Sequence, residues 1–309
     1  MITHAPRALA GRTVVVTRAR HQAEALGALL EQEGARVHYV PMIRIVPPAD
    51  AAPLRAAAAR TDWDWIVFTS ANAVAPFAEA LEALEAAGRE ALPPRTRVLS
   101  VGPATAEALE RAGFPVDLVP EAHLGEGVLE ALVGHAGPKR GGRAPADREL
   151  AGTRILLPRA AHAREVLPEG LRARGATVEV VEAYRNVPET EGAVELRRLL
   201  AAGEVDIVTF TSSSTVRAFA RSVLPVPESD APDSAAPGGS APGADVAVPT
   251  APDRAAVPSA PGRAAVATIG PVTSATAREL GLTVAIEADP YTVPALVRAC
   301  AEWASHAGR

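Results

Sequence analysis

The chain has 309 residues, a formal net charge of −5, 48% hydrophobic and 4% aromatic residues, and a single cysteine, Cys300. This length suits two domains with full cores, and the negative charge argues against a nucleic-acid partner. One cysteine excludes an intrachain disulfide, and the lack of a long apolar run or a signal-peptide pattern predicts a cytoplasmic protein without a membrane anchor.

In the first half of the chain, short apolar runs alternate with stretches rich in Ala, Leu and Glu. Thr13–Thr17 predicts a buried parallel strand, and Gln22–Glu33 predicts a helix that ends at Gly34. Further strands, the last two followed by helices, are expected at Arg36–Pro41, Trp65–Phe68 and Val98–Val101.

The second half repeats this alternation. Alternating strands and helices joined by short turns predict α/β architecture with parallel sheets and right-handed crossovers. The expected strands are Arg154–Leu157, Val178–Val181, Ile207–Phe210 and Val266–Ile269.

Two stretches break the pattern. Gly134–Ala151 is basic and Gly-rich, and we expect an exposed connector there. Pro225–Arg263 is dense in Pro, Ala, Gly and Ser with almost no large apolar residues, so it predicts a disordered surface insertion.

Three blocks of sequence occur twice, in the same order. Their recurrence predicts two structurally similar halves, and a cleft between like units is a natural binding site. Block 1 is Gly11–Ile45 and Gly152–Asn186, block 2 is Asp64–Phe77 and Asp206–Phe219, and block 3 is Val98–Gly113 and Val266–Gly281.

The strands of blocks 2 and 3 end in hydroxyl-rich or Gly-Pro turns that open directly into helices. Helix N-termini carry unpaired N–H groups with partial positive charge, and open α/β sheets bind ligands at the carboxyl ends of their strands. The turns therefore suit carboxylates or phosphates, although Ser and Thr there also serve as ordinary helix caps. The turns are Thr69–Asn72, Gly102–Thr105, Thr211–Thr215 and Gly270–Thr273.

Arg18 and Arg159 follow the first strand of each half at matched positions. Each guanidinium suits a ligand carboxylate, and a surface ion pair with a neighbouring helix is the alternative. The matched His21 and His162 fit solvent-facing or helix-packing positions. No metal-ligand spacing, dinucleotide fingerprint, P-loop or nucleophile elbow occurs, so no metal site is expected.

Taken together, the blocks resemble uroporphyrinogen-III synthases, the cofactor-independent enzymes of tetrapyrrole biosynthesis. The resemblance covers nearly everything outside the connector and the insertion. The segments that carry it are VVVTRA (Val14–Ala19), VFTSANAV (Val67–Val74), SVGPATAEAL (Ser100–Leu109), VEAYRNVP (Val181–Pro188), TFTSSSTVRAF (Thr209–Phe219) and ATIGPVTSATARELG (Ala267–Gly281).

The resemblance changes the expected domain organisation. The repeats alone suggest two consecutive domains divided near Gly141, whereas the family has two flavodoxin-like parallel-sheet lobes joined by a two-stranded connector, with one lobe discontinuous in sequence. Carried to this chain, the connector strands are Pro41–Pro48 and Ala183–Pro188, and the lobes are 1–42 with 186–309 (insertion 225–263) and 43–185 (connector 134–151).

The resemblance also implies an activity. It indicates a lyase that closes hydroxymethylbilane, a linear tetrapyrrole rich in carboxylates, to uroporphyrinogen III, with inversion of the last ring and loss of water. No cofactor is implied. A monomer is implied, with transient contact to the preceding enzyme of heme biosynthesis.

Among the site residues, Tyr184 matches the family tyrosine that faces the cleft, where its phenol would assist hydroxyl departure as a general acid. A connector tyrosine packed between lobes is the alternative. Thr105 and Thr273 match the family's cleft threonines. Pro158 stands where the first half has Thr17, so we do not expect equal use of the two arginines. The other expected carboxylate-binding residues are Arg18, Ser70, Arg159, Ser212, Ser213 and Ser214.

Two other functions remain open. One is a non-catalytic tetrapyrrole-binding regulator of the same fold, which is disfavoured because no helix-turn-helix region is expected beyond the last helix. The other is an unrelated bilobal protein that binds small anions.

Overall fold

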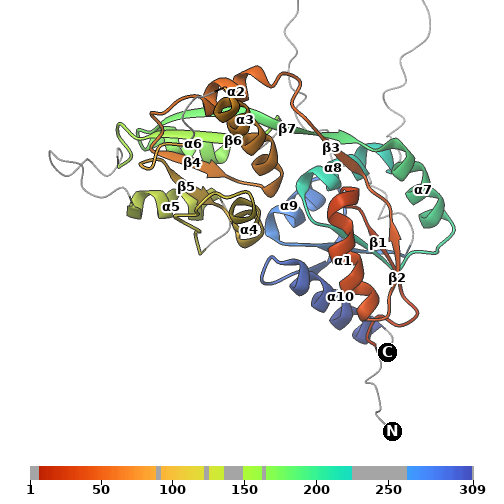
Figure 1. Ribbon diagram of the computed structural model, residues 1–309. Coiled ribbons are helices and arrows are strands. Elements are labelled where there is room, and N and C mark those ends of the chain that lie inside the picture. Colours follow the sequence, from red (N-terminus) through yellow and green to blue (C-terminus); the bar gives the residue numbers. More distant parts are fainter. Residues whose placement is uncertain are drawn as a thin grey trace, which may run out of the picture. The chain divides into compact units, whose positions relative to one another are not determined.

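The computed structural model describes residues 7–87, 92–121, 125–135, 149–161, 165–224 and 263–307. The chain folds into two compact units, Met1–Arg44 with Pro188–Arg309 (unit 1) and Ile45–Val187 (unit 2). Two five-stranded sheets with flanking helices carry the fold (Figure 1). The two parallel-dominated sheets confirm the predicted α/β class.

Unit 1 has a sheet in the strand order β2-β1-β8-β9-β10, and every neighbouring pair in it is parallel. Numbered along the unit, this is the 2-1-3-4-5 order of flavodoxin-like sheets. The strands are β1 (Thr13–Val16), β2 (Arg36–Tyr39), β8 (Ile207–Phe210), β9 (Ala265–Thr268) and β10 (Val284–Glu287). The helices are α1 (Arg20–Gln32), α7 (Thr190–Ala201), α8 (Ser213–Ser222), α9 (Pro271–Glu279) and α10 (Val293–Ala307).

The second sheet has the order β3-β7-β6-β4-β5, and its β7–β6, β6–β4 and β4–β5 pairs are parallel. A parallel bridge between Leu99 and Leu118 extends it beyond β5. The strands are β3 (Ile43–Val46), β4 (Trp65–Phe68), β5 (Arg97–Ser100), β6 (Arg154–Ala160) and β7 (Thr177–Pro188). The helical segments are α2 (Ala52–Ala58), the 3₁₀ turn η1 (Ala71–Ala73), α3 (Val74–Ala86), α4 (Pro103–Arg111), α5 (Gly125–His135) and α6 (Val166–Ala173).

The repeated blocks are exchanged between the two units. Unit 1 combines the first copy of block 1, which forms β1, α1 and β2, with the second copies of blocks 2 and 3, which supply β8 and β9. The other sheet combines the second copy of block 1, in β6 and β7, with the first copies of blocks 2 and 3, in β4 and β5. The order β2-β1-β8-β9 therefore corresponds strand for strand to β7-β6-β4-β5.

The β4 strand shows why these short apolar runs form strands. Ile66 and Phe68 pack into one core cluster, whereas Trp65 and Val67 pack into another, so the sheet of unit 2 is buried on both faces. This burial is typical of parallel sheets and explains a continuous apolar run in place of strict alternation.

Aromatic packing repeats between the units. The rings of Phe68 and Phe77 meet edge to face with centroids 5.4 Å apart, and those of Phe210 and Phe219 do the same at 5.2 Å. All four are block 2 residues, and each pair fixes the helix that follows a central strand against that strand. Few aromatics suffice because Ala, Val and Leu fill most of the remaining core.

The predicted strands and the observed ones agree closely. β4 and β8 match the predicted bounds to the residue, and Gly34 adopts φ of +92° directly after α1, as a helix-ending glycine does. β6 and β7 run longer than predicted, and β7 continues to Pro188. None of the described helices has the length and apolar character needed to cross a bilayer.

The predicted exposed connector over Gly134–Ala151 differs from the structure in two details, although Gly134, His135 and Ala151 are exposed. α5 continues to His135, and the side chain of Leu150 is fully buried in the core that also contains Ile155. The apolar spacing of α5 continues through Gly134, so the helix extends into the predicted connector. At the other end of the connector, a single leucine in a polar stretch, Leu150, fixes the chain to the core. Residues 136–148 lie outside the described part of the chain, as do residues 225–262 of the predicted insertion.

Gly192 offers a test of the close packing of α7. A Cβ atom at Gly192 would lie 2.0 Å from the carbonyl oxygen of Pro41. We expect Gly192→Ala to lower the free energy of unfolding by about 2 kcal/mol, although helix propensity alone would favour Ala by about 1 kcal/mol. Denaturant unfolding measures the change. Gly134→Ala in α5, where nothing lies within 4 Å of the new Cβ, is the control and should not destabilise.

Candidate functional site

In unit 1 the predicted site residues lie at the carboxyl ends of three adjacent strands. Arg18 follows β1, Ser212–Ser214 follow β8, and Thr273 lies in the first turn of α9 after β9. Strand order reverses between β1 and β8, and such a reversal point is where open α/β sheets bind ligands. The structure therefore brings these residues to one edge, which we call the carboxyl edge of unit 1.

Two threonines hold that edge together. Thr17 Oγ1 donates a hydrogen bond to the carbonyl oxygen of Thr209 at 2.6 Å, and Thr209 Oγ1 donates to the carbonyl oxygen of Val15 at 2.9 Å. Both threonines are fully buried. Sequence reasoning missed this pair, although threonine inside an otherwise apolar strand was a usable signal.

Arg18 is the cation of this edge. Its side chain is partly buried, and it makes no hydrogen bond or ion pair with the part of the chain that the structure describes. Burial lowers the pKa of the Arg18 guanidinium from its ordinary value, yet arginine titrates so far above neutrality that the group remains charged. A partly desolvated cation without a carboxylate partner is suited to an anionic ligand.

The serines after β8 are engaged within the protein. Ser212 caps α8, because its Oγ accepts a hydrogen bond from the Thr215 N–H at 3.3 Å and shares another with Ser214 Oγ at 2.9 Å. Ser213 Oγ accepts from Thr276 Oγ1 at 2.8 Å and donates to the Val272 carbonyl at 3.4 Å. The capping alternative thus holds for Ser212, whereas Ser213 joins the N-termini of α8 and α9. Their binding of substrate stays a prediction.

Thr105 and Thr273 occupy matched positions in the first turns of α4 and α9. Their backbone N–H groups each donate to the carbonyl of the capping glycine, Gly102 or Gly270, at 3.1 Å. Both threonines are buried, at 7% and 4% exposure, yet neither hydroxyl has a hydrogen-bond partner among the described residues. Neither helix has a side-chain cap. The two hydroxyls therefore have hydrogen-bonding capacity left for a ligand.

In unit 2 the remaining predicted residues also lie toward the carboxyl ends of adjacent strands. Ser70 follows β4 and caps η1, with its Oγ accepting from the Asn72 N–H at 3.2 Å. Thr105 follows β5, and Arg159 and Tyr184 lie near the ends of β6 and β7. We call this the carboxyl edge of unit 2.

A β-bulge orients Tyr184. Arg159 is paired with Glu182, but the next residue, Ala160, is paired with Tyr184, so Ala183 is the extra residue in β7. A bulge places consecutive side chains on one face of a sheet, and Ala183 and Tyr184 do lie in the same core cluster. Bulges are enriched beside active sites because they redirect a side chain.

Tyr184 is 7% exposed and packs within the core of unit 2. Its hydroxyl makes no hydrogen bond with the described residues, nor is it among their fully enclosed polar atoms. The ring is therefore fixed by packing while the phenol remains available. Sequence reasoning did not foresee the bulge, because nothing in VEAYRN marks an extra residue.

The two matched arginines differ in state. Arg159 is buried within β6, and its guanidinium forms an ion pair with the Glu165 carboxylate. The ion-pair alternative thus holds for Arg159, whereas Arg18 has no such pair with described residues. His21 is exposed on α1, and His162 lies outside the described residues.

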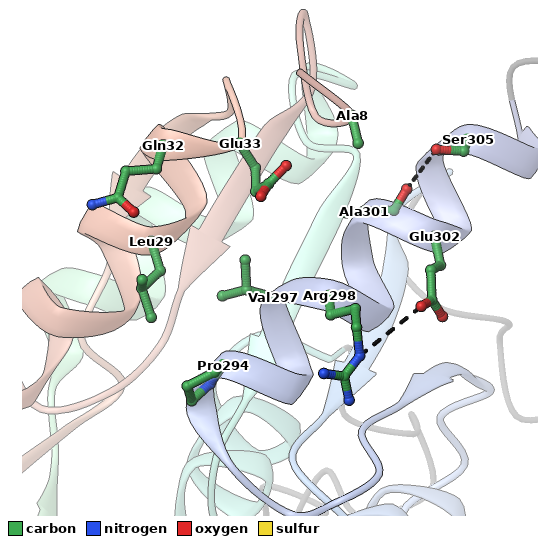
Figure 2. Close-up of a pocket in the computed structure, with 10 residues that line it drawn as sticks. All are labelled: Ala8, Leu29, Gln32, Glu33, Pro294, Val297, Arg298, Ala301, Glu302 and Ser305. Atoms are coloured by element: carbon green, nitrogen blue, oxygen red, sulfur yellow. Dashed lines mark hydrogen bonds and ion pairs between the residues drawn. The ribbon is translucent and has the colours of Figure 1, made fainter. Parts of the chain in front are cut away.

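A separate hollow of about 460 Å³ runs along the seam between α1 and α10 in unit 1 (Figure 2). Its apolar floor is Leu29, Pro294 and Val297, and its polar rim includes Glu33 and a 4.0 Å ion pair between Arg298 and Glu302. None of the predicted site residues lines it. The hollow has two carboxylates, Glu33 and Glu302, and one cation, Arg298, which is already in an ion pair. It is therefore unsuited to a polyanionic ligand.

Cysteine and metal chemistry find no support in the described residues. Burial raises the pKa of the Cys300 thiol to about 12, so it remains a thiol at neutral pH and is a poor nucleophile. In the described ranges no group of three or more His, Cys, Asp or Glu side chains is placed so that it could hold a metal ion.

A pair of substitutions separates capping hydroxyls from unpartnered ones. Ser212→Ala removes the cap of α8 and should lower the free energy of unfolding by about 1 kcal/mol. Thr273→Val removes a hydroxyl without a described partner and should change it by less than about 0.5 kcal/mol. Denaturant unfolding of both variants measures the two changes in the free energy of unfolding. A larger decrease for Thr273→Val would mean that the Thr273 hydroxyl makes a hydrogen bond within the protein.

Comparison with known proteins gives the family. The family model described as "Uroporphyrinogen-III synthase HemD" matches residues 24–232. A uroporphyrinogen-III synthase of Synechococcus elongatus is 30% identical over 97% of this chain and 98% of its own length, and one of Chlorobaculum parvum is 30% identical over 94% and 98%. A crystal structure of a mutant uroporphyrinogen III synthase from Thermus thermophilus, 18% identical, superposes with a TM-score of 0.58 over 95% of this chain and 98% of that one, which supports the fold. The chain therefore belongs to the uroporphyrinogen-III synthase family.

Proposed function

We propose that this protein is a uroporphyrinogen-III synthase, a lyase that closes hydroxymethylbilane to uroporphyrinogen III with inversion of the last ring and loss of water. The match to curated synthases over nearly the full length of both chains carries the proposal. The family match also includes most of the predicted site residues, from Ser70 to Ser214. We further propose that the reaction needs no cofactor.

Substrate binding is assigned to the two carboxyl edges. Hydroxymethylbilane presents carboxylates along a flexible chain, so its binding requires several separate donors. Arg18 and Thr273 in unit 1 and Thr105 in unit 2 have hydrogen-bonding capacity beyond what the described residues use. Each N-terminal helix contact contributes only about 0.3–1 kcal/mol when exposed, so binding depends on their number.

Tyr184 is assigned the role of general acid. Departure of the substrate hydroxyl as water requires a proton, and the phenol supplies it from a ring fixed by the bulge and by core packing. Loss of water leaves an electrophilic azafulvene, which can close in more than one way. The protein then selects the inverted product by holding the chain in a fixed geometry, which needs no protein nucleophile.

The domain organisation follows the same proposal. Residues 1–42 with 186–309 form one lobe and residues 43–185 the other, and each lobe has its own carboxyl edge. The two compact units of the fold, which divide after Arg44 and after Val187, support this assignment. We also propose a cytoplasmic reaction and transient contact with the preceding enzyme of the pathway.

The alternative of a non-catalytic regulator has no support among the relatives reported above, which are described as synthases. The comparisons with known proteins therefore favour the enzyme over both alternatives considered from the sequence.

The function is tested by incubating the purified protein with hydroxymethylbilane and separating the type I and type III isomers of the product by chromatography. We expect type III product to dominate, because binding at many points imposes the ring inversion. A reaction without protein gives the spontaneous background. Type I product alone, formed at the background rate, would refute the proposal.

Replacement of Tyr184 by Phe tests the general acid. The ring keeps its packing, so the melting temperature should change little, whereas kcat for type III formation should fall about tenfold or more. Tyr39→Phe is the matched control, because Tyr39 lies exposed on β2 and donates to Glu31 at 3.3 Å. An unchanged kcat in Tyr184→Phe would remove this residue from the mechanism.

A further inference from the structure

Arg159 already holds a carboxylate. Its side chain is 8% exposed, and its partner Glu165 has a side chain that is 53% exposed. A buried cation needs a counter-charge, because an uncompensated buried charge is strongly destabilising. Glu165 supplies that counter-charge from a position open to solvent.

The internal repeat contains a matched comparison. Glu24 stands at the position of Glu165 in the first copy of block 1, at the same distance in sequence from Arg18 as Glu165 from Arg159. Glu24 is exposed on α1, and it forms no ion pair with Arg18 in the described structure. The same sequence spacing therefore leaves Arg18 without an ion pair among the described residues and gives Arg159 a carboxylate partner.

Where each helix begins explains the difference. α1 starts at Arg20, four positions before Glu24, so Glu24 lies within the helix and forms no ion pair with Arg18 in the described structure. α6 starts only at Val166, so Glu165 precedes the helix and its side chain makes no capping hydrogen bond. Glu165 is the N-cap residue of α6, and its carbonyl oxygen accepts the first hydrogen bond of the helix from the Glu169 N–H at 2.9 Å. Its carboxylate makes no capping hydrogen bond, so it can contact the Arg159 guanidinium at the end of β6.

We propose that Glu165 is a resident carboxylate that a carboxylate of the substrate displaces from Arg159. The inference rests on the proposed function, since it concerns the same carboxyl edge of unit 2. Exchange of one carboxylate for another keeps the buried guanidinium paired throughout, and the released Glu165 side chain returns to water at small cost. Glu165 therefore weakens the binding of polycarboxylates at Arg159 and promotes their release.

The test compares Glu165→Gln with Glu24→Gln, which removes the same charge at the matched position of the other repeat. KM for hydroxymethylbilane should fall about three- to tenfold in Glu165→Gln, with kcat within about twofold of the wild type, because uniform binding changes KM alone. Glu24→Gln should leave both constants unchanged. Calorimetric titration with benzenehexacarboxylate, a non-reactive polycarboxylate, should show the same tightening for Glu165→Gln only.

Arg159 itself completes the test. Arg159→Gln should raise KM, and adding Glu165→Gln to it should bring no further gain, because the competition requires the guanidinium. An unchanged or raised KM in Glu165→Gln, together with a lower melting temperature, would show a structural ion pair and overturn the inference. An equal fall in KM for Glu24→Gln would show that the effect comes from the change in net charge alone, and it would also overturn the inference.

The outcomes separate this inference from the proposed function. If the wild type forms no type III product, the proposed function fails whatever Glu165 does. If the wild type forms type III product and Glu165→Gln tightens neither the substrate nor benzenehexacarboxylate, only the role of Glu165 fails.

Discussion

Pairing between strands from the two copies of the repeat is the constraint on which the structure depends. In unit 1, β1 pairs with β8, and the Thr17 hydroxyl binds the backbone of Thr209, a residue 192 positions away. Closing so long a loop costs entropy, which buried parallel strands and two buried hydroxyl contacts help to offset. In the other sheet β6 pairs with β4 in the same relation. Without these pairs neither reversal point in strand order would exist, and the predicted residues would not share an edge.

Much of this arrangement could be predicted from the sequence. The bounds of β4 and β8 follow from their apolar runs, and the end of α1 follows from Gly34. Block order, in contrast, predicts two consecutive halves, because sequence similarity does not say which copy of a block pairs with which. The exchange of blocks depends on long-range strand pairing, and only the family resemblance predicted it.

Details of the site escaped prediction for local physical reasons. The bulge at Ala183 depends on the pairing of β7 with β6, and an isolated strand carries no sign of it. The state of each arginine depends on where the following helix begins, which short sequence patterns define poorly. Equally, a serine or threonine in a strand-to-helix turn looks the same in sequence whether it caps a helix, as Ser212 does, or keeps a hydroxyl available, as Thr273 does.

The discontinuity of unit 1 has a consequence for biosynthesis. Unit 2 is a single stretch of chain, Ile45–Val187, whereas unit 1 begins with the first residues and needs β8, β9 and β10 from the last third of the sequence. During translation β1 can pair early with β2, but its pairing with β8 is possible only after Ile207–Phe210 has emerged, when all of unit 2 has already been synthesised. The order of maturation would then run from the centre of the chain outward, with the sheet of unit 1 completed last.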